Sequence, residues 1–290
     1  TILNEENLGE VESLGWLYQF YIAEKKDALM KAKKAYKTDE IPAVTQLFTP
    51  NWIVKYLTQN SIGRLWLSVY PSSPLKDKME YYIEPAEQTD EVNKQLAEIT
   101  PKSLNPEEIT VLDPACGSGH ILVEAYNLLK EIYLERGYQE KEIPRLILKN
   151  NLFGLDIDDR AAQLARFVLL MKARKDDRRL FRLKDEIQFN VHAIQESNGF
   201  NLSDFKALEI EGVDELIDTF QNAKTFGSLI EVPDSLGGKL KSMTHEVFEV
   251  VKNPSFDSEL AKQLIPLVIQ ASILSKKYNT VIANPPYLGG

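Results

Sequence analysis

The stretch Asp113-Pro114-Ala115-Cys116-Gly117-Ser118-Gly119-His120 lies near the middle of this 290-residue chain. A short apolar segment that ends in an acid, residues 109–113, leads into it, and an amphipathic segment, residues 119–136, follows it. We predict a strand, a glycine-rich turn and a helix. Because glycine has no side chain, a turn of this kind lets backbone N–H groups approach a ligand closely. The stretch therefore predicts both an α/β fold and a binding site.

The same pattern continues on the C-terminal side of the turn. Residues 151–156 form a second apolar segment that ends in an acid, and residues 159–175 follow with helical spacing of apolar side chains. Residues 187–194 and 280–283 are predicted to be a third and a fourth strand. Strands that alternate with helices predict a parallel sheet covered by helices.

The N-terminal part has a different pattern. The first 70 residues show helical periodicity, and we expect Thr49 to cap a helix and Pro50 to occupy its first position. Residues 75–105 are polar and contain prolines, which is typical of a loop or a connecting helix. We therefore place a boundary near residue 105, so that residues 1–105 form a helical N-terminal region.

The remaining residues, 106–290, are predicted to form one α/β domain that carries an insertion. Residues 197–275 interrupt the alternation of strands and helices. We expect this insertion to be largely helical, with loops around residues 233–238, where proline and glycine occur.

Composition narrows the class of protein. A hydrophobic content of 43% and a charged content of 27% are typical of a globular protein. The single cysteine, Cys116, excludes an internal disulfide framework and suits a reducing cytoplasm. No apolar run approaches the roughly 20 residues that span a bilayer, so we expect no membrane association. The three histidines are scattered, and we expect no metal site.

The charge of the chain bears on nucleic-acid binding. A formal net charge of −9 argues against wrapping DNA, because such affinity depends on lysine and arginine at phosphates. Residues 172–184 are locally basic. We interpret them as the solvated end of a helix and the following turn, in preference to a patch that contacts phosphates. If DNA is the substrate, we expect most of the basic surface in a C-terminal part beyond this chain.

Spacing and charge around the glycine turn indicate its ligand. A dinucleotide-binding turn needs a third glycine at position 122, where this chain has Leu122. Asp113, directly before the turn, would repel a pyrophosphate but suits the sulfonium and ammonium groups of S-adenosylmethionine. Asp156 ends the next strand, where an acid can accept hydrogen bonds from both ribose hydroxyls. We therefore expect S-adenosylmethionine and not NAD or FAD.

A second motif, Asn284-Pro285-Pro286-Tyr287, follows the last predicted strand. The exocyclic amine of adenine is a poor nucleophile, because its lone pair is delocalised into the ring. The side-chain carbonyl of Asn284 and the backbone carbonyl of Pro285 can accept its two hydrogens and free that lone pair. Pro286 stiffens the turn, and Tyr287 offers an aromatic face on which a flipped base can stack.

Methylation of cytosine C5 is disfavoured by the same residues. That reaction needs a cysteine nucleophile that forms a covalent adduct. The sole cysteine, Cys116, lies inside the glycine turn, where we expect it to pack against its neighbours. We likewise expect His120 to be a residue of the first helical turn and not a base.

Four motifs in this order resemble the gamma class of adenine-N6 DNA methyltransferases of restriction systems. They are Phe48-Thr49-Pro50, the turn from Asp113 to Gly119, Gly154-Leu155-Asp156-Ile157-Asp158, and Asn284-Pro285-Pro286-Tyr287. More narrowly, Asn-Pro-Pro-Tyr-Leu-Gly-Gly at the C-terminus and Thr225-Phe226-Gly227-Ser228-Leu229-Ile230 in the insertion look like the PglX family of BREX phage-defence systems. The resemblance spans nearly the whole chain.

The resemblance implies a fold, a site and partners. The fold is a Rossmann-like S-adenosylmethionine-dependent methyltransferase sheet after a helical N-terminal region. Phe48, Thr49 and Pro50 would pack over the methionine end of the cofactor, and Ile194, Gln195 and Glu196 would contact its adenine. Ile157, next to Asp156, would be a further cofactor-binding residue. The chain ends three residues after Tyr287, so we expect a truncated sheet in a longer protein. A further C-terminal region would read double-stranded DNA, and other defence proteins would be partners.

Two other functions remain open at this point. Enzymes that methylate RNA amines or protein glutamine share the tetrapeptide. In those families, the tetrapeptide usually lies some 60–80 residues after the cofactor turn, as the resemblance implies. Here Asp113 and Asn284 are 171 positions apart (284 − 113), which favours the DNA enzymes. A non-catalytic S-adenosylmethionine-binding scaffold is the second alternative, and the intact tetrapeptide argues against it.

Overall fold

The computed structural model describes residues 23–24, 26–29, 31, 49–182, 187–252 and 255–285. Within these residues, one four-stranded parallel sheet has the strand order β3-β2-β1-β4. The strands are β1 (Val111–Asp113), β2 (Leu152–Asp156), β3 (Asn190–Ala193) and β4 (Thr280–Val281). All four predicted strands are confirmed, and each is shorter than the sequence indicated. The α/β Rossmann-like architecture is confirmed as well.

The register brings the candidate site residues to one edge of the sheet. Asp113 pairs with Gly154, and Asp156 pairs with Ala193. Beyond β4, the backbone nitrogen of Ile282 still donates to the carbonyl of Leu112 at 2.9 Å. Because all strands are parallel, their carboxyl ends lie together at this edge, which is where ligands bind in open α/β sheets.

Helices from both sides of residue 105 cover one face of the sheet. These are α4 (Asn51–Thr58), α5 (Arg64–Val69), α7 (His120–Glu135), α8 (Ile143–Leu146) and α9 (Asp159–Asp176), with a π-helical turn, η1 (Gln59–Gly63), between α4 and α5. Trp66 and Ile62 are fully buried in the same cluster as Leu122, Leu129 and Val111. One core thus spans both sides of residue 105.

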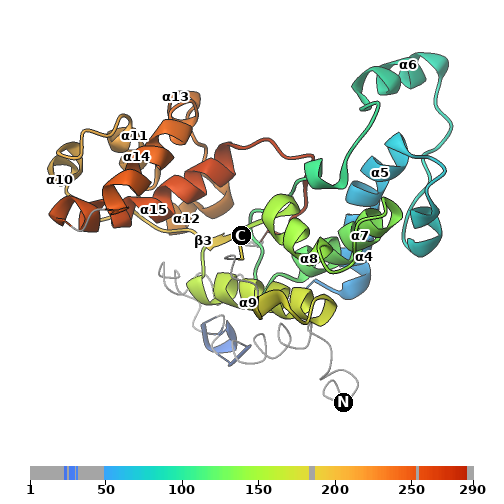
Figure 1. The fold of residues 1–290 in the computed structure, drawn as a ribbon, viewed down its shortest axis with the longest axis horizontal. Coiled ribbons are helices and arrows are strands. Elements are labelled where there is room, and N and C mark those ends of the chain that lie inside the picture. Colours follow the sequence, from blue (N-terminus) through green and yellow to red (C-terminus); the bar gives the residue numbers. More distant parts are fainter. Residues whose placement is uncertain are drawn as a thin grey trace.

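The predicted insertion covers the other face. Its helices are α10 (Leu202–Lys206), α11 (Val213–Thr219), α12 (Ala223–Phe226), α13 (Asp234–Gly237), α14 (Leu240–Lys252) and α15 (Phe256–Ser275), which gather on one side of the molecule in Figure 1. Leu112 and Leu155 point into this second core, whereas Val111 and Leu152 point into the first. Strand side chains alternate between faces, so the sheet separates two cores. The insertion is therefore needed to bury half of the sheet.

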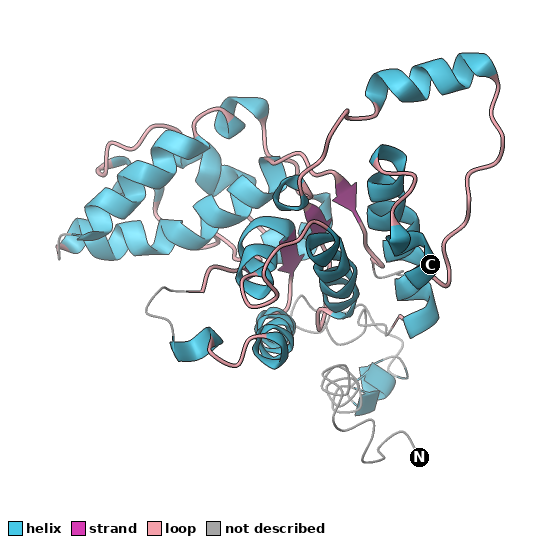
Figure 2. Cartoon of the chain, turned by 45° about the vertical axis from the view of Figure 1, so that its right-hand side comes forward, coloured by secondary structure: helices cyan, strands magenta, loops and turns pink. Residues whose placement is uncertain are grey.

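Several shorter elements complete the described chain. Four 3-10 segments are η2 (Pro74–Lys78), η3 (Pro106–Glu108), η5 (Leu180–Arg182) and η6 (Gly227–Leu229), and a second π-helical turn is η4 (Ile147–Asn151). The helix α6 (Asp90–Ile99) stands away from the body in both views, on two long loops (Figures 1 and 2). All residues of α6 are at least partly exposed, which agrees with the prediction of a loop or connecting helix.

Three local predictions are wrong. Residues around 233–238 were expected to be loops, but Asp234–Gly237 form a helical turn, because Leu236 is fully buried in the second core and fixes it there. Thr49 does not cap α4. The helix begins at Asn51, so Pro50 is its N-cap and not its first residue as predicted. Among the described residues no side chain caps the helix, and the hydroxyl of Thr49 accepts from Asn284 instead. None of the described helices is both long and apolar enough to cross a membrane.

Candidate active site

The glycine turn between β1 and α7 owes its shape to two glycines. Gly117 and Gly119 have φ angles of +53° and +85°, in the left-handed region that side chains disfavour. A Cβ on Gly119 would lie 3.0 Å from the Cβ of Ala165, so α9 packs directly on the turn. The backbone nitrogen of Cys116 donates to the carbonyl of Leu155 at 2.9 Å and holds the turn against β2.

Asp156 binds the turn from the end of the neighbouring strand. Its Oδ2 accepts a hydrogen bond from the backbone nitrogen of Gly117 at 2.7 Å, and its Oδ1 accepts one from that of Asp158 at 2.8 Å. Burial raises the pKa of this carboxyl to about 6, and the two backbone donors oppose the rise. Each carboxylate oxygen can accept a further hydrogen bond, so Asp156 can hold two ribose hydroxyls without releasing the turn.

Asp113 is the most deeply buried acid of the site. Its side chain is 1% exposed, and its Oδ1 accepts a hydrogen bond from the backbone nitrogen of Ala115 at 3.1 Å. Burial raises the pKa of Asp113 to about 8, and the negative charge of Asp156 adds to the effect of burial. A nearby cation would favour the ionised form, because it replaces the lost hydration of the carboxylate. The donor set therefore suits a cationic ligand.

The turn also leaves room for such a ligand. A Cβ built on Gly117 would meet no atom of the described residues within 4 Å, whereas one on Gly119 or Gly154 would collide with neighbours. Gly117 thus borders open space, whereas Gly119 and Gly154 allow neighbouring residues to pack closely. Cys116 is 5% exposed and packs behind the turn, as predicted. Pro114, Ala115 and Ser118 are half-buried around it. Two carboxylates beside open space at a glycine turn are residues that could hold a ligand with a cationic group and hydroxyl groups, such as S-adenosylmethionine.

The second motif reaches the same edge from β4. The side-chain nitrogen Nδ2 of Asn284 donates to the hydroxyl oxygen of Thr49 at 2.9 Å. Thr49 is 7% exposed, Asn284 is half-buried, and Pro285 is exposed. The structure thus brings together two predicted site residues that are 235 positions apart. Phe48, Pro286 and Tyr287 lie outside the described residues.

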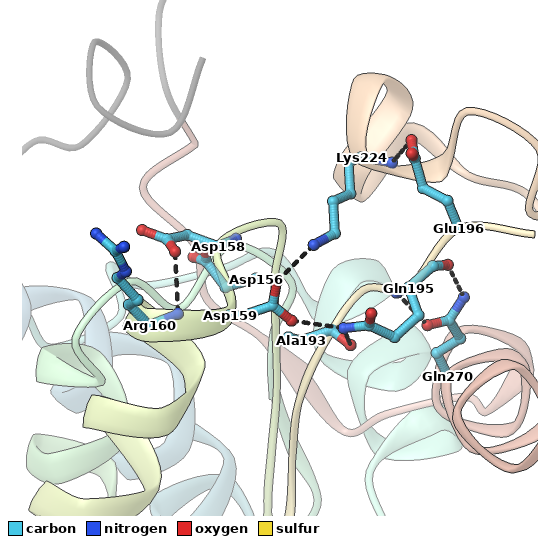
Figure 3. A network of polar contacts seen from close by, with 9 residues as sticks. All are labelled: Asp156, Asp158, Asp159, Arg160, Ala193, Gln195, Glu196, Lys224 and Gln270. Carbon is cyan, nitrogen blue, oxygen red and sulfur yellow. Dashed lines mark hydrogen bonds and ion pairs between the residues drawn. The ribbon is translucent and has the colours of Figure 1, made fainter. Parts of the chain in front are cut away.

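The segment after β3 forms hydrogen bonds with β2 and with the insertion. Ile194 is fully buried, and its backbone nitrogen donates to the carbonyl of Asp156 at 2.8 Å. The buried side chain of Gln270 makes two hydrogen bonds with the backbone of Gln195. The backbone nitrogen of Gln195 donates to Oε1 of Gln270 at 2.8 Å, and Nε2 of Gln270 donates to the carbonyl of Gln195 at 2.9 Å. Figure 3 shows these groups side by side. Cofactor contacts of Ile194, Gln195 and Glu196 stay a prediction.

An ion pair joins the insertion to the start of α9. The Nζ of Lys224 lies 2.6 Å from Oδ2 of Asp159, and the Nε2 of Gln195 donates to the other oxygen at 2.6 Å. The backbone nitrogen of Lys224 donates to Glu196 at 2.9 Å (Figure 3). Burial raises the pKa of Asp159, but the hydrogen bonds from Lys224 and Gln195 and the charge of Lys224 outweigh burial, so that this pKa is lowered. Sequence reasoning missed Asp159, Lys224 and Gln270, because no local pattern marks partners so far apart in the chain.

His120 begins α7, as expected. Burial lowers the pKa of this histidine to about 4, so the ring is neutral at pH 7. A neutral ring carries no charge that could balance a neighbouring carboxylate.

Comparisons with known proteins identify the family of the chain. A family model described as "MmeI, DNA-methyltransferase domain" matches residues 86–290. The adenine-specific methyltransferase BrxX of Escherichia coli O9:H4 (strain HS) is 52% identical over 99% of this chain and 26% of its own length. The adenine-specific methyltransferase PglX of Lacticaseibacillus casei (strain Zhang) is 38% identical over 97% of this chain and 24% of its own length.

A third relative matches a short part of the chain. A putative type II restriction enzyme and methyltransferase of Methanocaldococcus jannaschii is 42% identical over 22% of the chain. The chain spans about a quarter of the length of the first two relatives.

Proposed function

Because this chain belongs to the family of the MmeI DNA-methyltransferase domain, we propose that it transfers a methyl group to the N6 amine of adenine in DNA. The observation that carries the proposal is the position of Asn284. It follows the strand that pairs with β1, at the edge where the glycine turn lies, and its amide nitrogen is held by Thr49. Its carbonyl oxygen is then the end that can accept a hydrogen from a target amine.

The proposed chemistry needs acceptors and positioning. When bound, S-adenosylmethionine supplies a methyl group on a positively charged sulfur. The Oδ1 of Asn284 and the carbonyl of Pro285 accept the two N6 hydrogens, so the nitrogen lone pair is directed at the methyl carbon. The bond between N6 and the methyl carbon forms as the bond between that carbon and sulfur breaks. The electron pair of the broken bond stays on sulfur, and the surplus N6 proton leaves to solvent. Orientation and hydrogen bonding by the chain lower the barrier.

The cofactor is assigned to the turn and the acids that flank it. We place the ribose at Asp156 and the cationic end toward Asp113, with backbone groups from Pro114 to Gly119 next to the cofactor. The fit rests on two half-buried or buried carboxylates with raised pKa values and on open space beside Gly117. Ile157 is half-buried next to Asp156 and can contact the adenine or ribose.

The relatives suggest a biological setting. BrxX and PglX are named as adenine-specific methyltransferases, and the wider resemblance is to phage-defence and restriction systems. We propose the same role here, with double-stranded DNA as substrate, other proteins of a defence system as partners, and the cytoplasm as the place of action. Recognition of a DNA sequence is assigned to parts of the protein outside the described residues.

The test is a methylation assay of the full-length protein, with the partners it requires. Radiolabelled methyl uptake by DNA, RNA and protein identifies the substrate, and mass spectrometry of digested DNA locates the methyl group. Asn284→Ala should lower turnover by about 10²-fold or more, in line with loss of an oriented hydrogen-bonding group. Its affinity for S-adenosylmethionine, measured by calorimetry, should match that of the parent. Methyl groups on cytosine C5, or an active Asn284→Ala enzyme, would contradict the proposal.

A further inference from the structure

We propose that Thr49 is a positioning residue that orients the amide of Asn284, an inference that rests on the proposed adenine methylation. The contact is the 2.9 Å hydrogen bond from Nδ2 of Asn284 to Oγ1 of Thr49. A target amine offers hydrogens, so the catalytic asparagine must present its oxygen to the base and keep its nitrogen elsewhere. Thr49 supplies the acceptor that receives this nitrogen.

An asparagine amide has two orientations of nearly the same shape. A rotation of 180° about its last side-chain bond exchanges oxygen and nitrogen, and packing hardly distinguishes the two. In the exchanged orientation, Nδ2 would face the N6 hydrogens and repel them. In the structure the Thr49 hydroxyl accepts from Nδ2 of Asn284, which satisfies this half-buried N–H group and leaves Oδ1 for the base. The contact therefore holds the amide in the productive orientation before the base arrives.

The position of Thr49 makes it suited to this task. It is 7% exposed and directly precedes Pro50, whose φ of −52° and ψ of 140° lead into α4. The carbonyl of Pro50 accepts bonds from the nitrogens of Ile53 and Val54, and Val54 is fully buried in the first core. The hydroxyl therefore lies two residues before a packed helix, whereas Asn284 lies on the segment that leaves β4. The contact joins these two parts of the chain.

This role differs from the one that the family resemblance implies for the segment. There, Phe48, Thr49 and Pro50 contact the methionine end of the cofactor. A residue that mainly binds the cofactor affects its dissociation constant, whereas a residue that orients Asn284 affects the rate of methyl transfer at saturating cofactor. The two roles therefore predict different kinetic effects of the same substitution.

The experiment compares Thr49→Val, Thr49→Ser and a control, Thr58→Val, in the full-length enzyme. Valine keeps the shape of threonine and removes the acceptor, while serine keeps it. We expect Thr49→Val to lower kcat at saturating DNA and cofactor by about tenfold or more, as for loss of one hydrogen bond in the transition state. Thr49→Ser should stay within about threefold of the parent, and the cofactor Kd from calorimetry should change by less than about threefold in both.

The control removes a buried hydroxyl from α4, the helix that begins two residues after Thr49. Thr58 is fully buried in α4, and its hydroxyl donates to the carbonyl of Val54 at 3.0 Å, away from Asn284. Thr58→Val should therefore leave kcat unchanged. An equal loss of kcat in Thr58→Val would assign the effect of Thr49→Val to general damage to α4 and overturn the proposal. Loss of cofactor affinity with normal kcat in Thr49→Val would overturn it as well.

A double-mutant comparison isolates the contact itself. In single-turnover assays on the Asn284→Ala background, Thr49→Val should cause no further loss of rate, because Thr49 acts through the missing amide. A further loss of about tenfold would contradict the proposal. The failure of the proposed function is a separate outcome: if mass spectrometry places the methyl group on another amine, adenine methylation is wrong, while the same comparison still tests whether Thr49 orients Asn284.

Discussion

Gly117 donates its backbone N–H to Oδ2 of Asp156 at 2.7 Å, so the turn after β1 is fastened to the end of β2. The second oxygen of the same carboxylate accepts a hydrogen bond from the backbone nitrogen of Asp158 at 2.8 Å. Asp156 therefore fixes the shape of the turn, and in the proposed function it also contacts the ligand. Its substitution should affect both structure and ligand affinity.

Asp156→Asn should weaken binding of S-adenosylmethionine by about tenfold or more. The amide nitrogen of asparagine would face a backbone N–H group or a ribose hydroxyl in place of an acceptor, which leaves a donor unpaired at about 1–3 kcal/mol. Isothermal titration calorimetry measures the change in Kd. Asp177→Asn is the matched control, because Asp177 is a buried acid that accepts from the nitrogen of Arg179 at the other end of α9. Equal affinity of Asp156→Asn and the parent would remove Asp156 from the site.

Asp113 should make the protein less stable as the pH rises. Burial raises its pKa from 3.8 to about 8, so between these values the folded protein keeps a proton that the unfolded chain has released. The folded state then binds more protons, and the free energy of unfolding falls with increasing pH across this window. Asp156, with its pKa raised to about 6, contributes in the same direction at the acidic end of the window.

The variant Asp113→Asn tests this assignment. Its amide oxygen can still accept the hydrogen bond from Ala115, and it cannot ionise. In the absence of cofactor, its free energy of unfolding should exceed that of the parent by about 1–3 kcal/mol at pH 8 and by less at pH 5. Urea unfolding at several pH values measures this difference. A constant difference between Asp113→Asn and the parent at all pH values would contradict the raised pKa.

Gly119→Ala should destabilise the protein more than Gly137→Ala. Both glycines have positive φ angles, +85° and +77°, so both variants incur the strain of the left-handed region, about 1–2 kcal/mol. A Cβ on Gly119 would also lie 3.0 Å from the Cβ of Ala165, whereas one on Gly137 meets no described atom within 4 Å. The midpoint of urea unfolding compares them. Equal losses would show that α9 yields freely to the extra methyl group.

Gln270→Leu should loosen the insertion from the sheet. The substitution leaves the N–H and the carbonyl of Gln195 without their 2.8 and 2.9 Å partners in a buried place, which should cost about 2 kcal/mol or more. Hydrogen exchange should increase at Gln195 and in α15. The exposed Gln263→Leu on the same helix should change stability by less than about 0.5 kcal/mol. Unchanged exchange at Gln195 in the first variant would contradict the role of Gln270.

The sequence by itself determined the order of elements and most of the candidate site. Apolar segments ending in Asp113 and Asp156 predicted β1 and β2, and the helices that follow them have their own periodicity, so α7 and α9 were found within a residue or two. Gly117 and Gly119 marked the turn, because the left-handed conformation needs residues without side chains. These are local properties, set by neighbours within a few positions along the chain.

The tertiary structure alone decided which distant groups meet. The sequence assigned the Thr49 hydroxyl to a helix cap, but it accepts a bond from Asn284, 235 positions away. The sequence treated residues 197–275 as an insertion, but they bury Leu112 and Leu155 on the second face of the sheet. Gln270 and Lys224 carry no local signal for their partners. A side-chain hydrogen bond between remote segments depends on how helices pack on the sheet, and that packing is decided by the two cores together.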